Sequence, residues 1–178
     1  MLMSGSARNA VKLDVLVESG LWKEPGKIKT LLRRAIGQAA AALSTSGVEI
    51  AIVLTDDSAI RLLNQQWRGI DAATNVLSFP TANQGARRPF VGDIVLAQQT
   101  IAREASAEHK PFAHHLAHLA VHGFLHLLGY DHQNDKDATV MERLECEILR
   151  RLAIPDPYRP TPAARHASRT KLRRNLMH

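Results

Sequence analysis

The chain has few of the features that cross-link small proteins or anchor them in membranes. Its 178 residues include one cysteine, Cys146, and only 4% are aromatic. A single cysteine excludes an intramolecular disulfide framework and a cysteine-rich structural zinc site. No apolar run approaches the roughly twenty residues needed to span a membrane, and the N-terminal MLMSGSARNA lacks the apolar core of a signal peptide. The sequence therefore predicts a cytoplasmic protein with no membrane partner.

Histidine, in contrast, is abundant and clustered. The run HGFLHLLGYDH extends from His122 to His132. Residues four apart share one face of a helix, so His122 and His126 can bind one ion from successive turns. Gly129 tolerates the left-handed conformation that ends helices, which lets the chain turn back and bring His132 to the same point. Three imidazoles with one open position are typical of catalytic zinc sites, so we predict one Zn²⁺ per chain, held by these histidines.

A second ligand pair competes with this one. His114 and His118 extend the same spacing of four residues backwards, so His118 and His122 also form a candidate pair. We prefer the later pair because only it adjoins the chain reversal that can deliver a third ligand. His114, His115 and His118 are then predicted to lie on the helix face, and His118 can line the site.

The histidine spacing also matches the long zinc-protease motif His-Glu-x-x-His-x-x-Gly-x-x-His, with one departure. Gly123 stands where that motif has its glutamate general base. A peptidase needs that carboxylate to take a proton from water and pass it to the leaving amine. Peptide hydrolysis is therefore disfavoured.

Hydrophobic periodicity predicts nine secondary-structure elements. Strands are expected over 11–17, 47–54, 76–79 and 91–97, and helices over 27–43, 58–67, 98–109, 112–128 and 135–152. This order is not a regular alternation of strand and helix, which disfavours a doubly wound sheet. We expect an α+β fold in which about five helices cover a mixed four-stranded sheet.

Three further expectations concern single side chains within or beside these elements. Thr55 or Asp56 can cap the helix over 58–67. Trp67, near the end of that helix, is predicted to be a core residue, although an exposed indole would be able to stack on a base. Cys146 falls in an apolar helical pattern and is predicted to be a core thiol.

Three stretches of the sequence carry a family resemblance. They are LNQQWRGIDAATNVLSFP, which ends at Pro80, VGDIVLA over 91–97, and HLAVHGFLHLLGYDHQNDKDATVMERLE over 118–145. Together they resemble the YbeY-type ribosomal RNA maturation endoribonucleases, in the family's order and over roughly residues 11–155. The chain departs in detail: Trp67 stands where the family often has tyrosine, and Ala73-Thr74-Asn75 where it often has Pro-Thr-Asp.

The resemblance implies a zincin-like α+β fold with the metal helix packed against the sheet. It also implies a zinc-dependent, single-strand-selective endoribonuclease that acts in 3′-end maturation of small-subunit ribosomal RNA and in ribosome quality control. The implied partners are ribosomal RNA and the ribosome or its precursors. Two alternatives remain open: a zinc peptidase of the zincin type, and a ribosome-associated adaptor whose metal only stabilises the fold.

Catalysis is expected to depend on the metal and two candidate residues. Three neutral imidazoles leave the ion its full charge, which can lower the pKa of bound water to roughly 7 for attack on a phosphodiester. The resemblance implies a catalytic arginine at Arg68, which the residues alone would describe as a surface cation at a helix end. Asp131 is the second candidate: it can orient a ligand or accept a proton, or it can only hold a turn through a hydrogen bond to the backbone.

Four residues are candidates for substrate binding: Asn64, Phe79, Arg87 and Arg88. Asn64 lies one helical turn before Arg68, and the two arginines belong to a polar loop. Phe79 lies in the segment 77–80, which forms either one wall of the groove or only an edge strand.

The end of the chain lacks acidic residues. Residues 159–178 contain six basic residues, whereas residues 1–158 contain equal numbers of each sign, so this tail supplies the whole net charge of +6. We expect one catalytic domain over 1–158 and a tail over 159–178 that is disordered in isolation. The tail serves either as a solubilising terminus or as an arm that contacts RNA.

Overall fold

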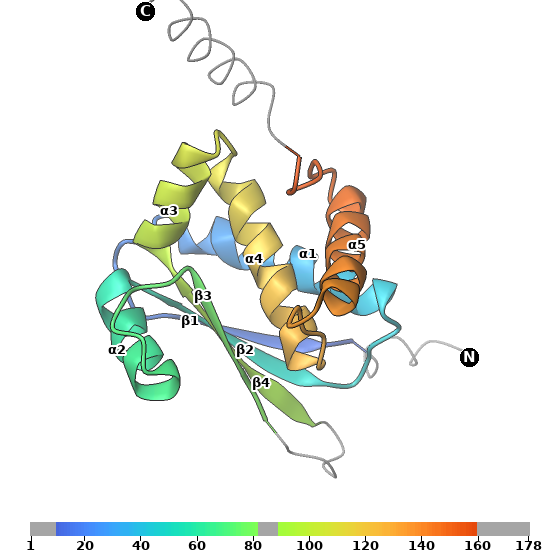
Figure 1. The fold of residues 1–178 in the computed structure, drawn as a ribbon, viewed down its shortest axis with the longest axis horizontal. Coiled ribbons are helices and arrows are strands. Elements are labelled where there is room, and N and C mark those ends of the chain that lie inside the picture. The colour runs from blue at the N-terminus through green and yellow to red at the C-terminus, as the bar shows by residue number, and fades with distance from the viewer. Residues whose placement is uncertain (1–9, 82–88, 160–178) are drawn as a thin grey trace, which may run out of the picture.

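A four-stranded sheet forms the centre of the molecule (Figure 1). Its strands are β1 (Lys12–Val17), β2 (Glu49–Thr55), β3 (Val76–Pro80) and β4 (Phe90–Ala97), in the order β1-β2-β4-β3. β2 runs parallel to both of its neighbours, whereas β3 is antiparallel to β4 and forms one edge. This computed structural model describes residues 10–81 and 89–159.

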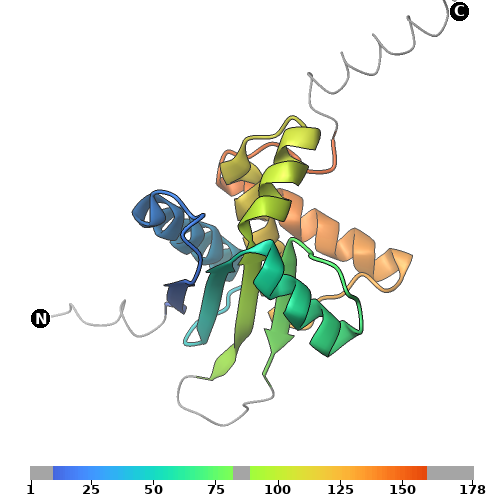
Figure 2. The same ribbon diagram turned by 90° about the vertical axis from the view of Figure 1, so that its left-hand side faces the viewer.

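Five helices surround the sheet in the described part of the chain. They are α1 (Pro25–Ala42), α2 (Asp57–Arg68), α3 (Gln98–Ala107), α4 (Phe112–Leu127) and α5 (Asp135–Arg151). α4 packs on β3, β4 and α1, and α5 packs on α1 and α4. α2 contacts β4 from the opposite face, and Figure 2 shows the strands between α1 and α2.

Alternation along the strands explains this layering. Ile50, Ile52 and Leu54 of β2 and Ile94 and Leu96 of β4 point to one face and are fully or almost fully buried there. They pack against the apolar stripes of α1 and α4 to form the main core. The opposite face has a smaller core under α2, made of Ile60, Leu77, Val95 and Ala97.

The predicted α+β class, the mixed sheet and all nine elements are confirmed, with ends that differ by at most two residues. The clearest shift is in α1, which begins at Pro25 rather than at residue 27, because proline is well suited to the first helical position. Asp56 caps α2, and its Oδ1 accepts a hydrogen bond of 3.1 Å from the Ala59 amide.

Two core predictions need correction. Trp67 is 65% exposed, because only Ile60 and Asn64 of α2 are buried and the last turn of that helix lies over an open part of the sheet. Cys146 is only half-buried, and Val140, one of the apolar residues in the helical pattern on which that prediction rested, is exposed. Burial nevertheless raises the pKa of the Cys146 thiol to about 11, helped by the neighbouring Asp156, so this thiol stays protonated.

No helix within residues 10–81 and 89–159 is long and apolar enough to cross a membrane. Arg87 and Arg88 lie outside the described residues, as does the basic tail from residue 160 onward.

Candidate metal centre

The end of α4 builds the chain reversal expected from the sequence. The helix ends at Leu127, and Gly129 adopts a left-handed φ of 91°. The amide of Gly129 then donates to the His126 carbonyl, and the amide of Tyr130 donates to the Leu125 carbonyl. These bonds satisfy carbonyls that the helix end would leave free, and they direct the following residues back toward the helix.

His122, His126 and His132 meet at this reversal. One ligand atom from each lies within 4.8 Å of the others, and the Nε2 atoms of His122 and His126 are 3.0 Å apart. Nitrogen ligands about 2.0–2.1 Å from a tetrahedral zinc ion would be about 3.3 Å apart. Small movements of the imidazole rings would therefore bring the three nitrogens to the separations that zinc requires. These three residues can therefore hold a metal ion, as the sequence predicted.

The electrostatics of the cluster favour the form of imidazole that binds metals. Burial lowers the pKa of His126, and the neighbouring His122 and His132 rings lower it further. A lowered pKa keeps the ring neutral, with a lone pair available on one nitrogen. His132 is the exposed member of the group, whereas His122 and His126 are half-buried.

Glu145 of α5 supports this cluster from behind, and sequence reasoning missed it. Its carboxylate is completely buried and accepts hydrogen bonds from His122 Nδ1 at 2.6 Å, from His118 Nε2 at 3.0 Å and from the Tyr158 hydroxyl. Burial opposes ionisation, but the hydrogen bonds from His118, His122 and Tyr158 outweigh it and lower the pKa of Glu145 to about 2. With its Nδ1–H held by this anion, His122 presents the unprotonated Nε2 to His126 and His132.

His118 therefore does not belong to the cluster. Its Nε2 is engaged by Glu145, and it does not line the cavity in front of the three histidines. His115 is also more than a helix-face residue, because it is 7% exposed and its Nε2 lies 2.8 Å from Glu104 Oε2.

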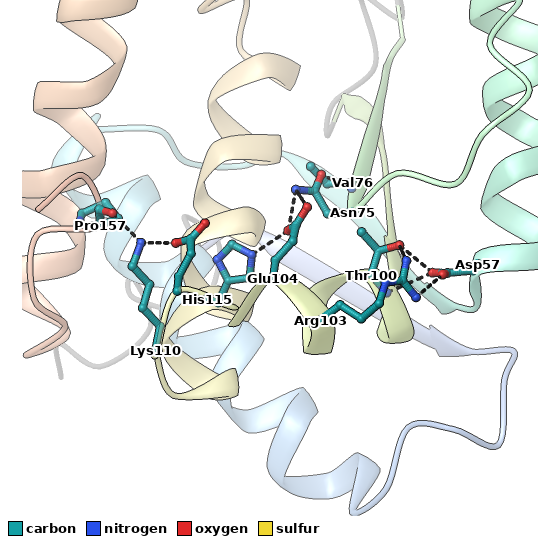
Figure 3. Close-up of polar contacts among 10 residues, drawn as sticks. Asp57, Asn75, Val76, Thr100, Arg103, Glu104, Lys110, His115 and Pro157 are labelled. Atoms are coloured by element: carbon teal, nitrogen blue, oxygen red, sulfur yellow. Dashed lines mark hydrogen bonds and ion pairs between the residues drawn. The ribbon is translucent and has the colours of Figure 1, made fainter. Parts of the chain in front are cut away.

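Glu104 links His115 to a residue at the edge of the site. The Asn75 side-chain amide donates to both oxygens of Glu104, at 2.9 and 3.2 Å, while its own oxygen accepts from the Val76 amide (Figure 3). Asn75 lines the cavity in front of the histidines. This chain of contacts between α4, α3 and β3 fixes one wall of the site.

The cavity itself has a volume of about 620 Å³ and is open to solvent on one side. It is lined by His122, His126 and His132 and also by Arg68 from the end of α2. The Arg68 side chain makes no hydrogen bond or ion pair within residues 10–81 and 89–159. Its guanidinium is therefore available to an anionic group placed beside the histidines.

The chain is similar to known proteins over most of its length. The sequence model of the family described as Endoribonuclease YbeY matches residues 21–153. The chain belongs to this family. It is 51% identical to Endoribonuclease YbeY of Nitrobacter hamburgensis over 155 residues, which cover 83% of this chain and 82% of that protein. It is 48% identical to the protein of the same name from Bradyrhizobium diazoefficiens, over 86% of this chain and 88% of that protein.

A solved structure supports the fold of this YbeY family member. The solution structure of TM1509 from Thermotoga maritima superposes with a TM-score of 0.55 at 26% sequence identity. The match covers 77% of this chain and 86% of the other.

The other site residues predicted from the sequence lie in different places. Asp131 lines the cavity, and its Oδ1 accepts a hydrogen bond of 2.7 Å from the His132 amide, which is the turn-holding contact considered above. Asn64 lies on the buried side of α2, where its amide donates to the Ala72 carbonyl, and it does not line the cavity. Phe79 points to the other face of β3, where it contacts Trp67.

Gly123 permits the close approach of α4 to the sheet. A Cβ at this position would lie 2.8 Å from Ile94 Cγ2 and 3.1 Å from Ser78 Oγ. The hydroxyl of Ser78 also donates to the Gly123 carbonyl at 3.3 Å. The place where a zinc protease would carry its glutamate is therefore occupied by β3 and β4 side chains.

Proposed function

We propose that this protein is a metal-dependent, single-strand-selective endoribonuclease, with zinc as its metal. Its proposed role is 3′-end maturation of small-subunit ribosomal RNA and ribosome quality control in the cytoplasm, with ribosomal RNA and the ribosome or its precursors as partners. Membership of the YbeY family supports the nuclease activity. The observation that carries the proposal is that Arg68 and the three histidines able to hold a metal ion line the same open cavity.

Each group in the cavity has a part in this chemistry. A metal ion held by His122, His126 and His132 would attract an anionic phosphodiester and acidify water beside it. Arg68 binds a phosphate oxygen and stabilises the charge that develops as the phosphorus is attacked. Asp131 holds the turn that presents His132, and Glu145 holds the ring of His122.

Peptide hydrolysis remains disfavoured on structural grounds. The Cβ of a glutamate at position 123 would lie 2.8 Å from Ile94 Cγ2 and 3.1 Å from Ser78 Oγ, so the packing of α4 against the sheet disfavours the carboxylate base that a zinc peptidase needs. RNA cleavage depends less on such a carboxylate. The alkoxide that leaves a phosphodiester needs protonation less than the amine that leaves a peptide.

RNA cleavage by the purified protein tests the proposal. Labelled single-stranded and duplex RNA of one sequence are incubated with zinc-loaded protein and with chelator-treated protein. We expect cleavage of the single strand only, abolished by the chelator. Arg68→Ala should lower the rate by roughly a hundredfold, the scale of losing one electrostatic stabiliser, with metal content unchanged.

A matched control is Arg34→Ala, which removes an exposed cation from α1 and should cleave at the normal rate. Full metal content without any RNA cleavage would contradict the nuclease and favour the adaptor role. Normal cleavage by Arg68→Ala would remove that residue from the mechanism.

A further inference from the structure

A second groove lies on the opposite face of β3 from the metal cavity. Its volume is about 570 Å³, and it opens between the end of α2 and the outer face of the sheet. Side chains alternate along a strand, so Phe79 points into this groove while Ser78 points toward Gly123 of α4. The groove's main lining side chains are Val53, Leu63, Trp67, Phe79, Asp93 and Val95.

Trp67 is the largest side chain that lines this groove. Its ring is 65% exposed and rests edge-on against Phe79, with ring centroids 5.7 Å apart. The other tryptophan, Trp22, is 4% exposed and donates its indole N–H to the Thr55 carbonyl. The exposed indole contributes little to the core, but its position against Phe79 leaves an aromatic face to which a flat ring can add.

The charge of the groove suits a nucleobase rather than a phosphate. Among the described residues that line it there is no lysine, arginine or histidine, and Asp93 is the one charged group. A carboxylate repels phosphate, but it can accept hydrogen bonds from the amino groups of bases. The metal cavity differs, because Arg68 and three histidines lie in its walls beside one carboxylate, Asp131.

The groove and the metal cavity are adjacent. Ser78 and Pro80 line both the groove and the metal cavity, so only the edge strand β3 separates them. Trp67 and Arg68 are consecutive residues at the end of α2, with one facing the groove and the other the cavity. A strand whose phosphate reached Arg68 would therefore bring an adjoining base to Trp67.

From this juxtaposition we infer that the Trp67–Phe79 groove is a base-binding subsite for single-stranded RNA. One unpaired base, next to the phosphodiester held by Arg68 and the histidines, stacks on Trp67, and Asp93 accepts a hydrogen bond from its amino group. The subsite presupposes the proposed RNA substrate and accounts for its single-strand selectivity, because a duplex keeps its bases stacked inside the helix.

Tryptophan fluorescence can detect this stacking directly. Single-stranded oligoribonucleotides are titrated into chelator-treated protein, so that binding is measured without cleavage. Trp22 is buried, so a change in emission would report on Trp67. We expect saturable quenching, and we expect Trp67→Ala to bind roughly tenfold more weakly by anisotropy of labelled RNA, while Trp67→Phe keeps most of the affinity.

Two further variants sharpen the assignment. Leu62→Ala removes a side chain of α2 that is 66% exposed and does not line the groove, so it should bind RNA as the unmodified protein does. A series of oligonucleotides, each with one abasic site at a different position, tests where the stacked base lies. The unmodified protein should bind one member of the series more weakly than the others, whereas Trp67→Ala should bind all members equally. Asp93→Asn should reduce the preference for bases with an amino group over uracil.

The outcomes separate this subsite from the nuclease activity. If RNA binds with unchanged Trp67 emission and with equal affinity for Trp67→Ala, the groove is no base site, and a protein partner becomes its better occupant. If quenching occurs but zinc-loaded protein never cleaves RNA, the subsite stands and the nuclease proposal fails. Absence of RNA binding would overturn the subsite as well.

Discussion

At the scale of single residues, the histidines of α4 differ in the contacts that their ring nitrogens make. His122 and His118 are one turn apart on α4, and both donate to the carboxylate of Glu145. Only His122 keeps a nitrogen facing His126. Glu145 therefore selects which ring nitrogen of His122 is unprotonated, and it does so from a position with no solvent exposure.

Replacing this carboxylate should weaken metal binding. In Glu145→Gln the neutral amide keeps the shape of the side chain but loses the negative charge that holds the Nδ1–H of His122. We expect zinc affinity to fall by roughly tenfold to a hundredfold, measured by competition with a chromogenic chelator.

Glu142→Gln provides the control, because Glu142 is an exposed residue of the same helix α5. Its zinc affinity should equal that of the unmodified protein. Unchanged affinity in Glu145→Gln would show that the histidines orient themselves without the carboxylate.

The three ligand histidines were easier to predict from the sequence than Glu145. The ligands follow from their spacing and from Gly129, because helix geometry alone places residues four apart on one face. Glu145 had a weaker signal: it occupies the apolar stripe of α5 between Met141 and Ile148, where a charged residue requires buried partners. Its partners come from α4 and from the segment after α5, and no local pattern predicts such long-range contacts.

At the scale of elements, α4 is positioned by how closely it approaches the sheet. Gly123 faces Ile94 and Ser78 with no space for a side chain. Because α4 also carries His122 and His126, its separation from β3 fixes the distance between these histidines and the wall of the cavity. The packing of α4 against the sheet therefore also determines the geometry of the site.

A pair of glycine substitutions tests this packing. Gly123→Ala should destabilise the fold by about 1–3 kcal/mol, because a Cβ lying 2.8 Å from Ile94 forces the helix or the strand to move. Gly37→Ala, in the middle of α1 with no atom within 4 Å of the added Cβ, should instead stabilise the fold by about 0.5–1 kcal/mol.

Both free energies of unfolding are measured with urea in the presence of a chelator, so that metal binding does not contribute. Equal effects of the two substitutions would contradict the close helix–sheet contact. A lower zinc affinity in Gly123→Ala would further show that the approach of α4 sets the site.

The elements were predictable, but their arrangement was only partly so. Apolar periodicity reports burial, so it located every helix and strand, including the alternation of Ile50, Ile52 and Leu54. It does not report which strands are neighbours, and the strand order β1-β2-β4-β3 is visible only in the structure. Trp67 was misplaced for the same reason, because periodicity cannot tell a covered face of a sheet from an open one.

At the scale of the whole molecule, charge is divided between the body and the end of the chain. Residues 1–158 are formally neutral, and the groove beside β3 carries one carboxylate. Of the two hollows on either side of β3, the metal cavity is the one lined by a permanent cation, Arg68. A further concentration of positive charge is the basic tail, whose basic residues after Arg159 are Arg165, Arg169, Lys171, Arg173 and Arg174.

Removing residues 160–178 tests whether the tail contributes to RNA binding. This cut leaves Arg159, which pairs with Asp156, in place. If all five tail cations contact single-stranded phosphates, the log–log salt dependence of affinity should decrease by up to about 3.5, at roughly 0.7 per neutralised phosphate. Affinity should weaken with little dependence on sequence, because contacts to phosphate carry no base information.

Zinc content and Trp67 quenching should be unchanged by this cut, since the histidines and the groove both lie within residues 10–81 and 89–159. The shortened protein is therefore its own control: a lower salt slope with normal quenching separates the phosphate contacts of the tail from base contacts at β3. An unchanged salt slope and affinity would instead leave the tail as a solubilising terminus, with all RNA recognition in the folded body.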